Sequence, residues 1–111
     1  MTQQARKSPR VRCNVSFQGG AASKNLSGRI TDLSGVGLFV STRRLIPVGK
    51  QVHLEFELAA GPVEAVGEVR WQSRQDSEQG PGLGIRFLRL SSTSARVIDE
   101  ALGLVEPATL D

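Results

Sequence analysis

The clearest pattern in the chain is a strict alternation of apolar and polar residues over residues 51–58. Its apolar members are Val52, Leu54, Phe56 and Leu58. A period of two places the apolar side chains on one face of a strand and the polar ones on the other. The same period predicts an earlier strand that begins near Arg10, with its apolar residues at Val11, Cys13, Val15 and Phe17.

Turn residues divide the rest of the chain into further strands. Gly19 and Gly20 predict a turn after the first strand, and four more strands are expected at about residues 24–33, 36–42, 63–73 and 82–90. In the first of these four, regular alternation would place Ile30 and Leu33 on opposite faces. Burying both side chains requires a β-bulge or a sharp twist near Asp32.

The C-terminal part of the chain predicts one amphipathic helix. Ser91 or Ser92 can cap its start, Pro107 ends it, and its apolar positions are Ala95, Ile98, Ala101, Leu102 and Val105. Six short strands followed by one helix favour an all-β fold, a small six-stranded antiparallel barrel covered by the helix. We expect a flexible basic arm over residues 1–9, the barrel with its helix over residues 10–106, and a tail over residues 107–111.

Composition bounds the class of protein. The chain has 111 residues, of which 39% are apolar and 23% charged, as in a single packed domain. A single cysteine, Cys13, excludes an internal disulfide and zinc sites built on paired cysteines, so we expect it to pack in the core. The sequence has no apolar segment typical of a signal peptide or a membrane span, and we therefore expect a cytoplasmic protein without membrane insertion.

The two halves of the chain carry opposite charge. Residues 1–50 contain nine Lys or Arg and one acid, Asp32, whereas residues 51–111 contain five Lys or Arg and ten acids. A basic first half favours a phosphate-bearing partner. Nucleic acid, a nucleotide and an anionic lipid all fit this charge.

Catalytic chemistry finds little support in the sequence. The only histidine, His53, falls on the polar face of the strand at residues 51–58, as do Glu55 and Glu57. Ser34 lacks the Gly-x-Ser-x-Gly context of a hydrolase nucleophile. We expect a protein that is not an enzyme and that has no catalytic residues, metal site or cofactor.

Two short motifs carry binding chemistry instead. Arg6 and Arg10 form an Arg-x-x-x-Arg spacing, and the second motif reads Asp-x-Ser-x-x-Gly at Asp32, Ser34 and Gly37. Arginine donates paired hydrogen bonds to phosphate oxygens or to the O6 and N7 edge of guanine, whereas a carboxylate accepts from the N1 and N2 donors of guanine. The Ser34 hydroxyl can donate to a phosphate, and Gly37 permits a close approach. Lys7 and Gly35, inside the two motifs, are further candidates.

The two motifs in this order resemble the paired signature of the PilZ domain, a bacterial receptor module for cyclic di-GMP. Residues 37–40, 67–71 and 82–87 are also similar to strands of that family. The resemblance implies a six-stranded barrel with a C-terminal helix, and cyclic di-GMP as the ligand of Arg6, Arg10, Asp32, Ser34 and Gly37. It also implies a conformational change that regulates a separate effector protein in motility, pilus, exopolysaccharide or biofilm output.

Two other functions remain open from the sequence. A PilZ-like barrel could serve as a protein interaction module that does not bind cyclic di-GMP. A small barrel with a basic arm could also bind single-stranded nucleic acid, which requires aromatic stacking platforms. The aromatic residues mostly fall on faces that alternation assigns to the core, which argues against nucleic acid; they are Phe17, Phe39, Phe56, Trp71 and Phe87.

Overall fold

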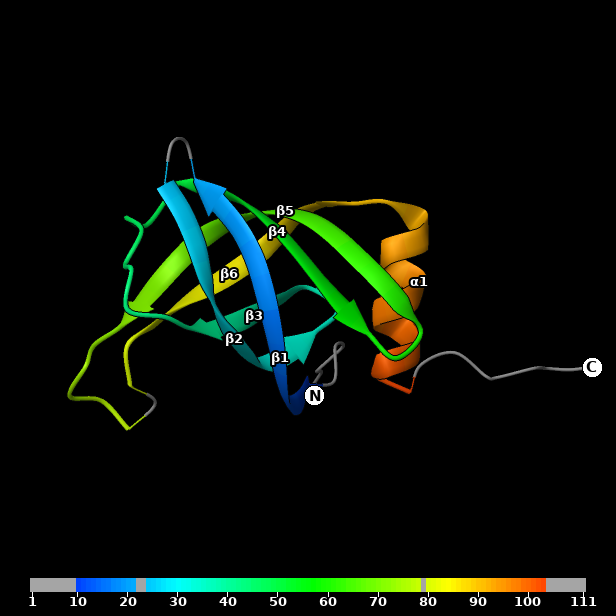
Figure 1. Ribbon diagram of the computed structural model, residues 1–111, viewed down its shortest axis with the longest axis horizontal. Coiled ribbons are helices and arrows are strands. Elements are labelled where there is room, and N and C mark those ends of the chain that lie inside the picture. The colour runs from blue at the N-terminus through cyan, green and yellow to red at the C-terminus, as the bar shows by residue number, and fades with distance from the viewer. Residues whose placement is uncertain (1–9, 22–23, 79, 104–111) are drawn as a thin grey trace, which may run out of the picture.

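The structure, a computed structural model, describes residues 10–21, 24–78 and 80–103. Within them, six antiparallel strands form a closed barrel in the order β1-β2-β3-β6-β5-β4, and a helix follows the last strand (Figure 1). The strands are β1 (Arg10–Ala21), β2 (Lys24–Ser34), β3 (Gly37–Ser41), β4 (Gln51–Leu58), β5 (Gly61–Ser73) and β6 (Gly82–Leu90). The predicted fold class is confirmed.

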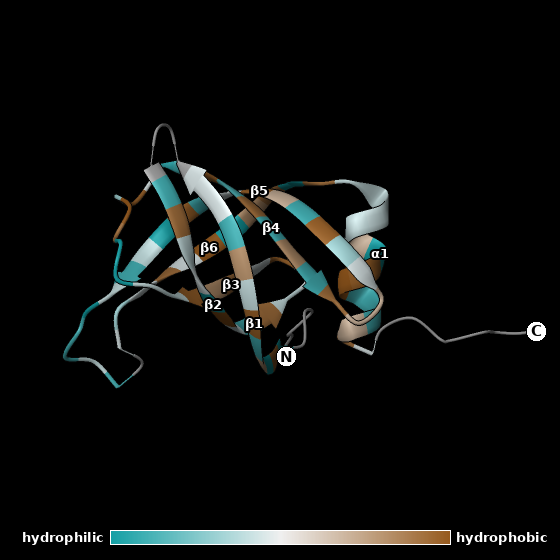
Figure 2. Cartoon of the chain, in the orientation of Figure 1, coloured by the Kyte–Doolittle hydropathy of each residue, from teal (hydrophilic) through white to brown (hydrophobic). Residues whose placement is uncertain are grey.

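The core fills the inside of the barrel and follows from the alternation in the sequence. In β4, every second side chain is buried, and Leu54 is fully inaccessible to solvent. The resulting change between hydrophobic and hydrophilic residues is visible along the strands in Figure 2. Cys13 is only half-buried and packs against the edge of this core, so the prediction that it packs in the core is confirmed in part.

The predicted turn at Gly19 and Gly20 is wrong, because both glycines lie inside β1. In this region β1 pairs with β2 on one side and with β4 on the other. The strands approach so closely that a Cβ built on Gly19 would lie 1.8 Å from the carbonyl oxygen of His53. These glycines therefore serve close strand packing, and the strand continues to Ala21.

Two β-bulges change which side chains face outward. In β2, the pairing with β3 shifts between Ile30 and Asp32, so that Ile30 and Leu33 are both buried, as predicted. In β5, the pairing with β6 shifts between Val69 and Trp71. Val69 is fully buried, whereas Trp71 is 44% exposed, so Trp71 is not among the aromatic residues that lie in the core.

The helix α1 (Ser92–Ala101) covers one side of the barrel, mainly over β5. Ser91 is its N-cap, and its hydroxyl accepts a hydrogen bond from the Ser94 amide. Its own side chains Val97 and Ile98 are buried and belong to the hydrophobic core. The helix ends before the predicted position, since Gly103 has a φ of 75°; Val105 and Pro107 lie outside the described residues. No described helix is both long and apolar enough to cross a membrane.

Candidate functional site

A cavity of 530 Å³ lies across the ends and outer faces of β1, β2, β3, β6 and β5. Four of the residues predicted from the two motifs line it: Arg10, Asp32, Ser34 and Gly37. The topology explains this, because β1, β2 and β3 are neighbours in the barrel, and the first motif ends where β1 begins. The two motifs therefore meet at one end of the barrel.

Strand register arranges the cavity residues in two cross-strand rows. In the first row, Asp32 is paired with Arg12 on β1 and with Phe39 on β3, and Phe39 is paired with Gly84 on β6. Trp71 on β5 follows Gly84 and ends this row. In the second row, Arg10 is paired with Ser34, and Gly37 with Arg86. The rows place cationic, anionic and aromatic side chains around the same cavity.

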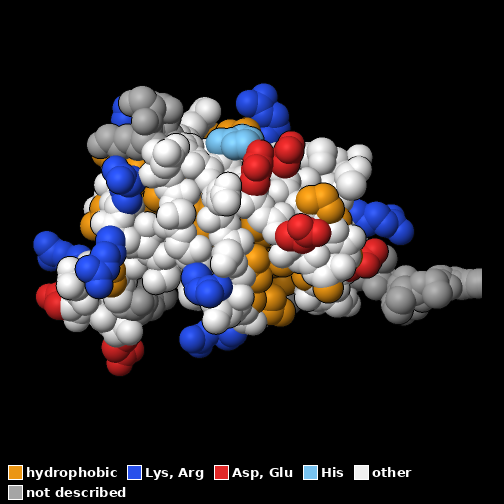
Figure 3. Space-filling model, viewed as in Figure 1, with side chains coloured by type: hydrophobic (Ala, Val, Ile, Leu, Met, Phe, Trp, Pro, Cys, Tyr) orange, Lys and Arg blue, Asp and Glu red, His pale blue; other side chains and the backbone are white. Residues whose placement is uncertain are grey.

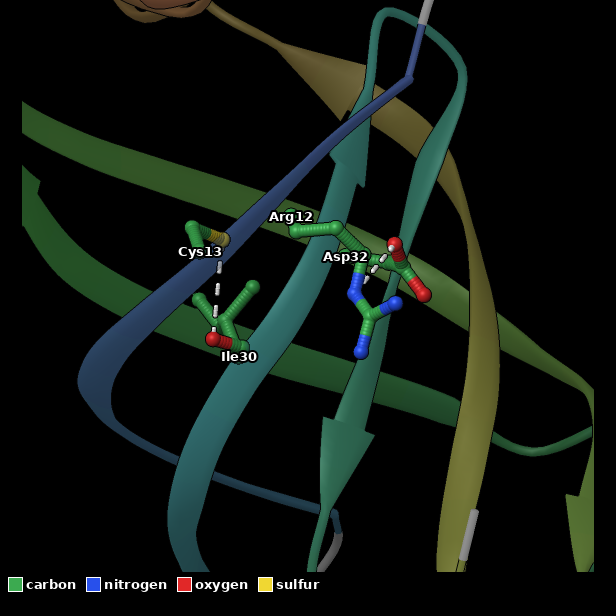
Figure 4. A network of polar contacts seen from close by, with 4 residues as sticks. All are labelled: Arg12, Cys13, Ile30 and Asp32. Carbon is green, nitrogen blue, oxygen red and sulfur yellow. Dashed lines mark hydrogen bonds and ion pairs between the residues drawn. The ribbon is translucent and has the colours of Figure 1, made fainter. Parts of the chain in front are cut away.

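Asp32 is the one acidic side chain among the described residues that line the cavity. The β2 bulge turns it away from the core, and its side chain remains 24% exposed. Its carboxylate faces the Arg12 side chain (Figure 4) and lies 4.0 Å from Nε of that residue. The Arg12 side chain is itself 89% exposed. An exposed ion pair of this length contributes at most about 1 kcal/mol. The carboxylate can therefore exchange this partner for a ligand at small cost.

Cys13 lies on the β1 side of Asp32, and its thiol donates to the carbonyl oxygen of Ile30 over 3.5 Å (Figure 4). Burial raises the pKa of the Cys13 thiol, and the nearby Asp32 carboxylate raises this pKa further. Both effects favour the protonated thiol. Cys13 is thus a poor nucleophile at neutral pH.

Ser34 organises the turn that joins β2 to β3. Its hydroxyl oxygen accepts hydrogen bonds from the amides of Val36 and Gly37, at 3.2 and 3.3 Å, and its proton is directed at the Gly37 carbonyl oxygen. The side chain is 8% exposed. In this structure the hydroxyl holds the backbone of the motif in shape, a role that the sequence did not predict.

Gly37 is required by the packing of β3 on β6. A Cβ at this position would lie 2.2 Å from the carbonyl oxygen of Ile85, well inside van der Waals contact. The close approach that was predicted at Gly37 is therefore made by the backbone of β6. Any side chain here would separate the two strands that form the floor of the cavity.

The remaining predicted residues are Arg6, Lys7 and Gly35. Arg6 and Lys7 are outside the described residues. Gly35 lies in the turn between β2 and β3 and does not line the cavity. Arg10 is exposed at the first position of β1, where its side chain is free to reach a ligand.

Sequence reasoning missed three residues of this cavity: Arg70, Trp71 and Arg86. They come from β5 and β6, far along the chain from both motifs. Arg70 and Arg86, together with Arg10, give the described lining of the cavity three arginines and one acid, Asp32. Acidic side chains instead gather over β4 and β5 in Figure 3, where Glu55, Glu57 and Glu64 are exposed. The described side chains that line the cavity thus carry a net positive charge.

Comparison with known proteins gives the family of this chain. The PilZ domain family matches residues 4–103, which include both motifs and every strand of the barrel. The chain belongs to the PilZ domain family. No curated protein matches it. The family assignment agrees with the barrel and with the meeting of the two motifs at one cavity.

Solved structures share the barrel of this PilZ domain. The Inhibitor of motility (MotI/DgrA) of Bacillus subtilis is 12% identical with a TM-score of 0.77, and the alignment covers 90% of this chain and 50% of that protein. The PilZ domain of YcgR from Escherichia coli, solved with c-di-GMP, is 20% identical with a TM-score of 0.69 over 90% of both chains. At such identities the likeness shows the fold alone, and this chain spans only half of the Bacillus subtilis protein.

Proposed function

We propose that this PilZ domain is a receptor for cyclic di-GMP, which binds in the cavity formed by the two motifs. The observation that carries the proposal is the meeting of Arg10, Asp32, Ser34 and Gly37 around one 530 Å³ cavity. A cavity of this size suits a ligand of one or two nucleotides. The c-di-GMP complex of the YcgR PilZ domain supports the choice of ligand.

Each motif residue has a distinct task in this proposal. Arg10, together with Arg6 from the segment before β1, donates to the ligand phosphates or to the O6 and N7 edge of a guanine. Asp32 leaves Arg12 and accepts hydrogen bonds from the N1 and N2 donors of a guanine. Ser34 keeps the turn in the shape that presents these groups, and its hydroxyl proton turns from the Gly37 carbonyl oxygen to a phosphate when the ligand binds.

Ligand binding would act as a switch on the surface of the barrel. When Arg6 and Lys7 contact the ligand phosphates, the arm over residues 1–9 closes over the cavity. The covered cavity and the repositioned arm together present a new surface to a separate effector protein. The proposed setting is the cytoplasm, where PilZ domains act as receptor modules rather than enzymes, and the proposed outputs are motility, pilus, exopolysaccharide or biofilm control.

The receptor proposal is tested by calorimetric titration of the full chain with cyclic di-GMP. Losing one charge-assisted contact of about 1.5–3 kcal/mol should weaken binding at least about tenfold in the Arg10→Ala variant. The matched control is Arg43→Ala, which removes an exposed arginine of the same basic half that does not line the cavity. Absence of binding by the parent chain would reject the receptor function. Equal affinities of the parent and Arg10→Ala would remove Arg10 from the site.

The nucleic-acid alternative loses support from the structure. Phe17, Phe39 and Phe56 are buried and Phe87 is half-buried, so within the described residues Trp71 is the one exposed aromatic ring. Binding of single strands without sequence preference uses successive stacking platforms along a groove. One ring inside a cavity does not provide this. A gel-shift assay with single-stranded RNA, in which we expect no complex, checks this alternative.

A further inference from the structure

Trp71 is the exposed aromatic side chain among the described residues that line the cavity, and its exposure has a structural cause. Alternation along β5 buries Val63, Ala65 and Val69, and a regular strand would have buried Trp71 as well. The bulge between Val69 and Trp71 reverses this, and the indole is 44% exposed. β-Bulges frequently re-aim a side chain next to a functional site. The β2 bulge, which turns Asp32 outward, lies at the other side of the same cavity.

Two neighbours hold the Trp71 ring in a fixed orientation. The indole is stacked on Phe39, with the ring centroids 5.3 Å apart and the planes inclined by 27°. It also lies so close to the backbone of Gly84 that a Cβ at that position would be 2.0 Å from Nε1. Because the ring is already immobilised, a ligand that contacts it loses little side-chain entropy. The exposed part of the ring is a preformed aromatic surface.

This aromatic surface lies in the same cross-strand row as the Asp32 carboxylate. Asp32 is paired with Phe39, and the Trp71 ring leans over Gly84 onto Phe39. Adjacent strands are about 4.8 Å apart, so Asp32 on β2 and Phe39 on β3 are separated by a single strand spacing. The carboxylate and the indole therefore both adjoin Phe39, from opposite directions along the row.

A third guanidinium lies in the neighbouring row. Arg86 is paired with Gly37 on β3 and with Glu68 on β5, and it lines the cavity with an exposed side chain. None of the ion pairs among the described residues involves Arg86, whereas Arg70 is held by Glu68 at 3.6 Å. Arg86 is thus available to an anionic group on the β6 side of the cavity, across from Arg10 and Ser34.

We infer that the β5–β6 wall is a second half of the ligand site, in which Trp71 stacks on a purine base and Arg86 contacts a phosphate. The inference rests on the proposed function and adds residues that neither motif contains. Stacking on an indole tolerates any base, whereas the Asp32 carboxylate selects guanine. Asp32, on the β2–β3 side of the cavity, therefore sets the identity of the base. Trp71 and Arg86, on the β5–β6 wall, add affinity for a phosphorylated purine.

The chain contains one tryptophan, so its intrinsic fluorescence reports Trp71 directly. Saturating cyclic di-GMP should change the emission of the parent chain and protect it from quenching by acrylamide. This measurement needs no variant, so it stands even if a substituted chain folds poorly. If calorimetry shows binding while emission and acrylamide quenching stay unchanged, the stacking inference is overturned and the receptor proposal survives.

Variants test the energetics of the same wall. Trp71→Ala should weaken cyclic di-GMP binding by roughly 5- to 150-fold, the range that base–aromatic stacking provides, and Trp71→Phe should retain most of the affinity. Leu88→Ala is the matched control, since Leu88 is 47% exposed on β6 but does not line the cavity. Arg86→Ala should lose at least about tenfold, and Arg89→Ala, an exposed arginine of the same strand outside the cavity, should lose nothing.

Base selectivity separates a ligand contact from a general loss of structure. Trp71→Ala should lower the affinities for cyclic di-GMP and for its adenine analogue by similar factors, whereas Asp32→Asn should reduce the preference for guanine. An affinity of Trp71→Ala equal to that of Leu88→Ala would contradict the role of the indole. No binding of cyclic di-GMP by the parent chain would instead reject the receptor function on which the inference rests.

Discussion

At the scale of single residues, Gly37 and Ser34 fix the backbone beside the cavity. Gly37 has the geometry of a strand residue, yet it tolerates no side chain because the Ile85 carbonyl oxygen lies where a Cβ would be. The Ser34 hydroxyl then fixes the turn directly before it. The motif residues thus do structural work before any ligand is present, which explains why a motif of polar and small residues occupies a largely buried position.

We expect Gly37→Ala to lower the free energy of unfolding by about 1–3 kcal/mol, the usual cost of overpacking, because β3 must move away from β6. Urea denaturation followed by fluorescence measures this. Val36→Ala is the control, since Val36 is 58% exposed in the same turn and exposed substitutions usually change stability by less than about 0.5 kcal/mol. Equal denaturation midpoints for the two variants would mean that the β3–β6 contact is not tight.

At the scale of elements, the alternation of apolar and polar residues predicted the strands, but it did not predict the β-bulge in β5. The bounds of β4 follow the alternation, because every second side chain of this strand is buried. β6 has the predicted bounds although its first four residues are all buried. The bulge near Asp32 was predictable from two apolar residues on opposite faces, but the bulge before Trp71 leaves no such conflict in the sequence. The outward position of Trp71 therefore could not be predicted, nor could the half of the cavity that β5 and β6 form.

The helix α1 should contribute stability without contributing to the site, since none of its residues lines the cavity. The Ile98 side chain of this helix is 1% exposed, and Ser94 of the same helix accepts a hydrogen bond from the Glu64 amide of β5 over 3.0 Å. Ile98→Val should lower the free energy of unfolding by about 0.5–1.5 kcal/mol and leave cyclic di-GMP affinity unchanged. Thr93→Val, an exposed change on the same helix, is the control for stability. A weaker affinity of Ile98→Val would show that the helix is coupled to the cavity.

At the scale of the whole molecule, arginines from both halves of the chain meet at one cavity. The basic first half supplies the β1–β3 side of the cavity, and the strands of the acidic second half carry their exposed glutamates over β4 and β5 (Figure 3). The exceptions are Arg70 and Arg86, which lie in the acidic half but line the cavity. Net charge by sequence segment thus favours an anionic ligand, and only the closed barrel brings the later arginines to the same cavity.

This arrangement makes ligand binding dependent on ionic strength. Raising the salt concentration from about 0.1 M to about 1 M shortens the screening length from roughly 10 Å to roughly 3 Å, which weakens attraction between an exposed arginine and a phosphate. The dissociation constant for cyclic di-GMP should therefore rise with NaCl, and the rise should be shallower in Arg10→Ala and in Arg86→Ala, because each variant removes one of the screened charges. Stacking on Trp71 is not an ionic contact, so Trp71→Ala should keep the slope of the parent chain while its affinity is lower at every salt concentration. Calorimetric titrations of the four chains across this range separate the two kinds of contact, and identical slopes for all four would contradict the assignment of Arg10 and Arg86 to the phosphates.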